Sequence, residues 1–273
     1  MVDTQETQRV FQFGWKEAGV VIAGFFIAQL LLGLPLLVFG FQLGESPYFL
    51  LVSYVVSFST CILALYYGVI KPSRQKFNLG FSRVPRLIYL IIFPLMLGVM
   101  LINECLTNLL PTTGPFWGEM YQTMLQTFER LIHYPYLMVF MTSICAPILE
   151  ELLFRGIIQR GLVNKGISVP KAIFYSAFVF GLVHGNPWQF LGATLMGCVL
   201  GYAYHLTHSI IVPILLHAFN NFIATLLMIG FKEESIGNAF GISEAYLLIT
   251  GAVLFGVFGF LLVKQKNKLQ YTD

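Results

Sequence analysis

Apolar runs of membrane-spanning length dominate this sequence and constrain its fold more than any other feature. About twenty apolar residues in a helix cross a bilayer, and only helices or closed barrels satisfy their backbone groups there. The runs fall at 18–41, 48–70, 87–110, 136–157, 171–187, 188–206, 209–230 and 244–263. Charged residues make up 11% of the chain, against about 25% in soluble domains. We therefore predict an all-α, polytopic transmembrane helical bundle of about eight spans.

The organisation of this bundle is simple. We find no internal repeat and no long linker, so we predict a single integral membrane domain over 1–273. Its motif-bearing core covers about 136–230. The fifth and sixth runs are separated only by the turn sequence Gly185-Asn186-Pro187. One of these two runs can therefore be a short or re-entrant segment instead of a full span.

The distribution of basic residues predicts the orientation, because Lys and Arg in short loops are retained on the cytoplasmic side. Basic residues follow the second, fourth and eighth runs, whereas the opposite loops carry mainly glutamate. We expect both termini to be cytoplasmic and the segment 111–135 to be external. The basic residues are Lys71, Arg74, Lys76, Arg83 and Arg86, then Arg155, Arg160, Lys165 and Lys171, and finally Lys264, Lys266 and Lys268.

Charge and cysteine content argue against several classes of protein. The net charge of +3 is too small to indicate nucleic-acid binding, since the basic residues lie in loops and not on one face. The four cysteines all fall within apolar runs, and none forms the close pair typical of a metal or redox motif. We expect them to be buried thiols.

Three ionisable residues lie in the fourth apolar run, where each costs several kcal/mol by insertion scales. On a helix, Glu151 and Arg155 are four residues apart and share one face, within ion-pairing reach. Glu150 is turned about 100° away and does not share that pair equally. The plain interpretation is the interfacial end of a helix. Two adjacent glutamates with apolar residues on both sides instead indicate one tethered and one free carboxylate.

Two later runs carry polar residues at the same helical spacing. Phe180 and His184 are one turn apart in the fifth run, and His217 and Asn221 are one turn apart in the seventh. Glu150 and these groups form a set able to hold, deprotonate and orient a water molecule, which is hydrolase chemistry. The same imidazoles and carboxylate are also able to bind a divalent metal that acidifies the water. The residues alone do not decide between these two mechanisms.

Other intramembrane hydrolase chemistries lack their residues. The only aspartates are Asp3 and Asp273, near the two ends, so a two-aspartate mechanism is not available inside the membrane. The sequence has no His-Glu-x-x-His zinc motif and no Gly-x-Ser-x-Gly elbow. Ser143 and Ser176 are conceivable nucleophiles, although serines in spans commonly bond to backbone or to a neighbouring helix.

At these residues the chain resembles the CAAX-protease and bacteriocin-processing family of intramembrane endopeptidases, also called the Abi family, which includes the type II CAAX prenyl endopeptidase. Its three motifs occur in order. The Glu-Glu-x-x-x-Arg motif is Glu150, Glu151 and Arg155, the Phe-x-x-x-His motif is Phe180 and His184, and the His-x-x-x-Asn motif is His217 and Asn221.

The resemblance implies a role for each motif residue. Glu150 is the base that activates water with His184, while His217 and Asn221 hold the oxyanion. Glu151 with Arg155, and Phe180 beside His184, support the site. Because the family has been described both as metallopeptidases and as glutamate-type peptidases, a divalent metal such as zinc remains open. Its ligands would be Glu150, His184 and His217.

We therefore expect an intramembrane endopeptidase that cleaves membrane-associated peptides, either prenylated or leader-bearing, in a bacterial plasma membrane. Its water-filled cavity should open toward the cytoplasm. The alternatives are a non-catalytic bacteriocin immunity protein and, less favoured, a transporter with a proton relay. The expectation carries one geometric difficulty: a straight helix from Lys171 places His184 about 20 Å deep, whereas Glu150 lies near the cytoplasmic end of its run.

Overall fold

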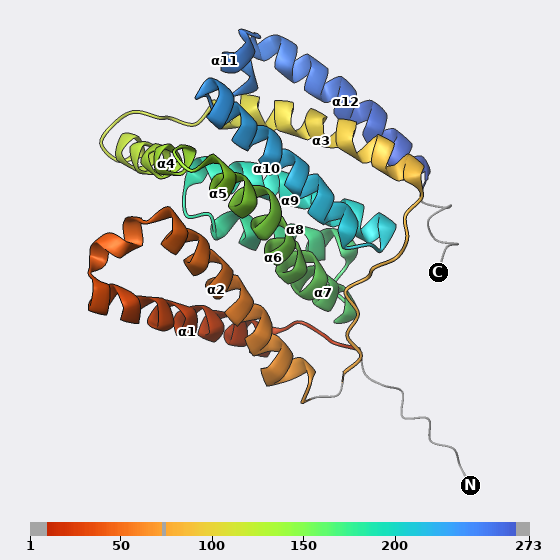
Figure 1. Ribbon diagram of the computed structural model, residues 1–273. Coiled ribbons are helices and arrows are strands. Elements are labelled where there is room, and N and C mark those ends of the chain that lie inside the picture. The colour runs from red at the N-terminus through yellow and green to blue at the C-terminus, as the bar shows by residue number, and fades with distance from the viewer. Residues whose placement is uncertain (1–9, 73–74, 266–273) are drawn as a thin grey trace.

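The computed structural model describes residues 10–72 and 75–265, and the regular elements of these ranges are helices joined by loops (Figure 1). Apart from two isolated bridges, Val10 with Lys76 and Phe81 with Ser209, no β-pairing occurs in these ranges. The predicted all-α bundle is therefore confirmed. Both chain ends and the topology markers Arg74, Lys266 and Lys268 lie outside the described residues.

Seven helical rods in the described ranges are long and apolar enough to cross a membrane. The fifth predicted run, 171–187, forms the shorter apolar helix α8 (Val169–Leu182), which ends before the Gly185-Asn186 turn. The rods are α1 (Trp15–Phe39), α2 (Pro47–Leu65) with its π-helical end η2 (Tyr66–Ile70), α3 (Arg86–Thr107), the rod α5–α7 (Pro135–Asn164), α9 (Pro187–Thr207), α10 (Ile211–Phe231) and α12 (Glu244–Lys264). The connections hold η1 (Phe41–Glu45), α4 (Trp117–Ile132) and α11 (Ile236–Phe240).

The bundle has three parts in space (Figure 1). The α1–α2 hairpin forms one edge, and α3 packed along α12 forms the opposite edge. The rod α5–α7, the pair α8 and α9, and α10 lie between these two edges. These two edges thus enclose the segment that carries all of the polar motif residues, with α4 beside the start of α5 (Pro135–Phe140).

The rod α5–α7 is longer than the sequence predicts. Its extra length removes the predicted difference in membrane depth between Glu150 and His184. It runs for 30 residues, or about 45 Å, against about 30 Å of hydrocarbon. The predicted run ended at 157, where hydropathy falls. The helix continues because Gln159 is buried and its amide donates to the Gly201 carbonyl at 2.8 Å. Glu150 consequently lies near the middle of the rod and not at its end.

Helices α8 and α9 approach each other very closely at Gly181. A Cβ atom built there would lie 2.1 Å from Thr194 Oγ1 and 2.7 Å from the Phe190 carbonyl oxygen, so the two backbones would have to separate. We expect Gly181→Ala to lower the free energy of unfolding by about 1–3 kcal/mol. Gly256→Ala on α12, where no atom lies within 4 Å, serves as the matched control and should not destabilise. Unfolding of the purified protein in detergent measures both; equal stability of the two variants would contradict this packing.

Candidate active site

The motif glutamates lie in α6 (Ala146–Glu151), a short α-helical stretch between two π-helical stretches of the same rod. These are η3 (Met141–Cys145) and η4 (Leu152–Gln159). Stretches of π-helix are rare and occur frequently at functional sites, since they redirect side chains and release backbone carbonyls. Glu150 and Glu151 are both buried here, on different faces of the rod.

Glu151 is fixed by two cationic or polar donors in the core. Arg155 Nη1 donates to Glu151 Oε1 at 2.9 Å, which is the ion pair expected from the spacing. The same oxygen accepts a hydrogen bond from His217 Nδ1 at 2.8 Å. Arg155 also donates to the Gly197 carbonyl at 3.2 Å, and its guanidinium lies 4.5 Å from the centre of the Phe180 ring. Both members of the ion pair are fully buried. Together, the contacts of Glu151 and Arg155 connect α6, α8, α9 and α10.

His217 lies between the two glutamates. Because Nδ1 donates to Glu151, the other ring nitrogen is directed away, and His217 Nε2 lies 3.7 Å from Glu150 Oε2. This separation is too long for a direct hydrogen bond. Within the described residues, no group donates a hydrogen bond to Glu150 Oε2, although that oxygen is buried. A buried carboxylate oxygen without a donor is costly, which indicates a place for water or substrate.

His184 follows the last turn of α8 and is oriented by its own helix. Its Nδ1 contacts the Phe180 carbonyl oxygen at 2.8 Å, and since a carbonyl only accepts, Nδ1 carries the proton. In the neutral ring, Nε2 is then an acceptor. The imidazole also packs edge-on against the Phe180 ring, with the ring centres 5.1 Å apart. Phe180 therefore contacts His184 through both its backbone carbonyl and its ring. The same ring also packs against His217 and Arg155.

Asn221 is held by the π-helical stretch η3. Its Nδ2 donates to the Thr142 carbonyl at 2.8 Å, and its Oδ1 accepts from Asn220 Nδ2 at 3.0 Å. A carboxamide has two N–H groups. Asn221 thus keeps one N–H for the space that it lines.

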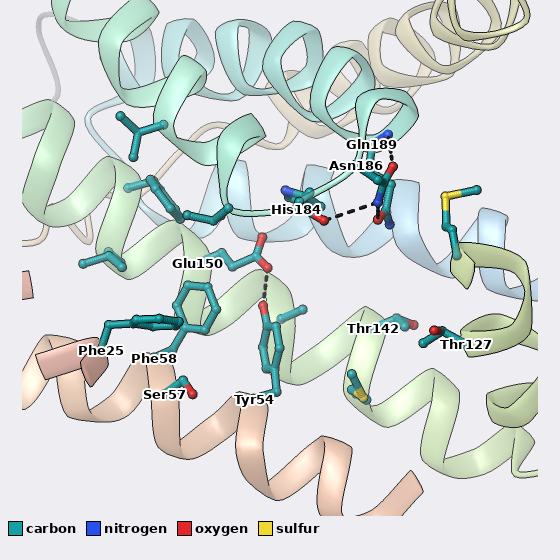
Figure 2. Close-up of a pocket in the computed structure, with 18 of the residues that line it drawn as sticks. Phe25, Tyr54, Ser57, Phe58, Thr127, Thr142, Glu150, His184, Asn186 and Gln189 are labelled. Carbon is teal, nitrogen blue, oxygen red and sulfur yellow. Dashed lines mark hydrogen bonds between the residues drawn. The ribbon is translucent and has the colours of Figure 1, made fainter. Parts of the chain in front are cut away.

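A cavity of about 1070 Å³ connects these side chains. Glu150, His184 and Asn221 all line it, and His217 lies directly behind Glu150. Its wall is mostly apolar and comes from α1, α2, α4, the rod α5–α7, α8, α9 and α10. Figure 2 shows the Glu150 carboxyl group between His184 and Tyr54. The structure therefore places three of the four residues predicted as catalytic on the wall of one cavity, and the fourth, His217, next to Glu150.

One partner of Glu150 is not indicated by any sequence motif. The Tyr54 hydroxyl, from α2, donates a hydrogen bond to Glu150 Oε1 across 96 residues of sequence (Figure 2). A tyrosine within an apolar run is common and belongs to none of the motifs. The amides Asn186 and Gln189, beside His184 on the cavity wall, were also missed as part of the site.

The suggested metal ligands Glu150, His184 and His217 carry the donor atoms that zinc prefers. Within 10–72 and 75–265, no three His, Cys, Asp or Glu side chains are grouped as a metal site. His217 engages Nδ1 with Glu151, and His184 engages Nδ1 with the Phe180 carbonyl, which is also how metal-ligating imidazoles are oriented, with Nε2 left for the ion. A metal ion held by these side chains would acidify the attacking water, and the residue roles below are derived from the protein groups.

Similarity to the matching family model lies in the motif-bearing segment. Residues 132–223 match the family model described as "Type II CAAX prenyl endopeptidase Rce1-like". The predicted family resemblance is confirmed. The Rce1-like segment holds all three motifs and runs from the end of α4 into α10. Tyr54, most of α4, and the edge formed by α3 and α12 lie outside it.

Two relatives with curated names are similar to part of the chain. "Putative membrane peptidase YdiL" of Bacillus subtilis (strain 168) is 36% identical over 93 residues, which are 34% of this chain and 38% of YdiL. "Membrane-embedded CAAX protease MroQ" of Staphylococcus aureus (strain USA300) is 35% identical over 89 residues, 30% of this chain and 36% of MroQ. The chain thus matches well under half the length of each. No solved structure is significantly similar to it. The match of this segment and the seven apolar rods support an integral, multi-pass membrane protein.

Proposed function

We propose that this chain is an intramembrane endopeptidase in which Glu150 activates a water molecule for peptide hydrolysis. The observation that carries the proposal is Glu150 itself. It is a buried carboxylate beside His184 and His217 at the wall of a large cavity, with one oxygen held by Tyr54 and the other without a donor among the described residues. The names of the partial relatives, a membrane peptidase and a CAAX protease, agree with this chemistry.

In the proposed reaction, water occupies the space next to Glu150 Oε2. Glu150 accepts one proton from this water, and His184 Nε2 accepts a hydrogen bond from the second hydrogen, which orients the oxygen. The oxygen attacks the peptide carbonyl carbon, and the carbonyl becomes a tetrahedral oxyanion. When the intermediate collapses, the C–N bond breaks and Glu150 gives its proton to the leaving amine. The immediate products are an amine and a carboxylic acid, which still carries the second hydrogen of the water and loses it to the amine or to solvent. The Glu150 carboxylate is regenerated.

Two groups are placed to stabilise the oxyanion. Asn221 offers the N–H that Thr142 does not use. His217 offers Nε2 when it is protonated, because Nδ1 is engaged with Glu151.

The substrate class proposed is a peptide that reaches the cavity from the membrane. The cavity wall is mostly apolar, which suits a peptide with a lipid-like or hydrophobic portion. A farnesylated CAAX peptide is the first probe, given the family description, and a leader-bearing peptide is the second. The non-catalytic immunity alternative needs only binding, so it predicts no cleavage of either.

The experiment is a cleavage assay with the full chain purified and reconstituted in lipid vesicles. Mass spectrometry follows the two peptide probes, and N-terminal labelling of membrane proteins in expressing cells detects substrates of other sequence. The proposal requires new termini with the wild-type protein that are lost in His217→Ala. Termini that appear equally with both proteins would contradict it. Protection from a peptide toxin that survives loss of cleavage would favour the immunity alternative.

The side of the membrane from which the cavity is reached is tested separately. Wall residues from α4, such as Thr123, lie in the segment that the charge pattern predicts to be external. The expected cytoplasmic opening and this topology therefore do not agree. We predict that Thr123→Cys reacts with an impermeant maleimide on intact cells, whereas Lys71→Cys reacts only after permeabilisation. Wild-type protein controls for the native thiols. Reaction of Thr123→Cys only in permeabilised cells would restore the cytoplasmic opening.

A further inference from the structure

Tyr54 makes a polar contact with Glu150 from outside the Rce1-like segment. Its hydroxyl donates to Glu150 Oε1, and both side chains line the cavity (Figure 2). The contact joins α2, at the edge of the bundle, to α6 in its centre. Neither the motifs nor the matched segment 132–223 includes this residue.

The contact makes the two oxygens of Glu150 different. Oε1 accepts the Tyr54 hydrogen bond, whereas Oε2 is buried without a donor among the described residues and faces His217 Nε2 at 3.7 Å. A carboxylate that is free to rotate would exchange these two positions. A donor on one oxygen fixes the plane of the group and leaves the other oxygen for water.

Packing holds the Tyr54 ring in the orientation that this hydrogen bond needs. Its centre lies 4.8 Å from that of Phe58, one turn along α2. The Phe58 ring in turn contacts Phe154 of the rod, with centres 6.5 Å apart, and Phe154 contacts Phe180 at 5.1 Å. An aromatic row therefore links Tyr54 with the ring that positions both histidines.

We propose that Tyr54 is a positioning residue that orients Glu150 and stabilises its ionised form for water activation. The proposal rests on the proposed function. Tyr54 touches the base and not the reacting atoms, so its removal should change turnover more than substrate binding. A hydrogen bond to a charged group contributes enough that losing it should lower kcat about 10- to 100-fold.

The pH dependence gives a readout that a merely structural role would not move. The ionisable groups facing Glu150 are Tyr54 from α2, His217 from α10 and His184 from α8, with Glu151 and Arg155 on its own rod. Of these groups, only Tyr54 is altered in the Tyr54→Phe variant. A donor to a carboxylate favours the ionised form, so without it the acidic limb of the rate profile moves to higher pH.

The experiment compares Tyr54→Phe with wild type, Tyr48→Phe and Glu150→Gln in the vesicle cleavage assay, with kcat, KM and the pH profile measured for each. Tyr48 lies on the same helix, packs on Tyr134 and does not line the cavity, so its variant controls for loss of a hydroxyl. We expect a lower kcat, little change in KM and a shifted acidic limb for Tyr54→Phe alone. Thermal unfolding of each variant confirms that the comparison is made on folded protein.

The outcomes separate this proposal from the proposed function. An inactive Glu150→Gln together with Tyr54→Phe at wild-type kcat and an unmoved acidic limb overturns the role of Tyr54 only. A fall in activity with an unmoved limb, or a change in KM alone, overturns it as well. Full activity in Glu150→Gln overturns both, because Tyr54 acts through that residue.

Discussion

Glu150→Gln is expected to lower kcat for peptide cleavage by at least about 100-fold, because a carboxamide cannot accept the proton of the attacking water. The change preserves the size of the side chain, and the Tyr54 hydroxyl can still donate to the amide oxygen. Substrate binding should therefore change little, so KM should stay within a few fold. The measurement is steady-state cleavage by the reconstituted protein, with single-turnover rates to separate chemistry from product release.

The matched control is Glu119→Gln, which makes the same chemical change on the wall of the same cavity. Glu119 lies on α4, and no hydrogen bond links it to Glu150 or the histidines within the part of the chain that the structure describes. We expect this variant to keep kcat within about threefold, since surface changes rarely exceed about 0.5 kcal/mol. Equal losses in the two variants would contradict a specific role for Glu150.

Arg155→Met is expected to cost about 3–5 kcal/mol of unfolding free energy, because it leaves Glu151 buried without its cation. Whole domains are stable by only about 5–15 kcal/mol, so much of this variant should unfold or fail to accumulate. The variant also removes the bond to the Gly197 carbonyl and the stacking on Phe180. Denaturant titration of protein purified in detergent measures the loss.

A second substitution distinguishes charge from packing in this pair. Adding Glu151→Gln to Arg155→Met removes the unpaired charge and keeps a group that can accept from His217 Nδ1. The double variant should recover at least half of the lost stability, since replacing both members of a buried pair is often near neutral. Arg130→Met, at an exposed position on α4, controls for loss of an arginine. A double variant no more stable than the single one would show that the ion pair is not what holds the rod.

Hydropathy was sufficient for most of the fold. The apolar runs located the seven rods and the short helix, because burial in lipid needs only length and composition. Hydropathy did not predict where the fourth helix ends. Gln159 and Arg160 lower the hydropathy there, but each donates a hydrogen bond to α9. Such contacts depend on which helices become neighbours, and a local window of sequence does not contain that information.

The site was predictable where its spacing was local. Glu151 and Arg155 are one turn apart, so their ion pair follows from helical geometry. The bond from His217 to Glu151 and the bond from Tyr54 to Glu150 join residues 66 and 96 positions apart. The π-helical stretches beside α6 also leave no pattern in the residues, although they set the directions of both glutamates.

An experimental structure of the full chain in lipid, at a resolution that resolves water, tests the central claim most directly. We predict an ordered water within about 2.6–3.2 Å of Glu150 Oε2 and in hydrogen-bond reach of His184 Nε2, with Asn221 on the same cavity wall and His217 next to Glu150. A Glu150 carboxylate with both oxygens occupied by protein donors, or a His184 turned out of this cavity, would contradict it.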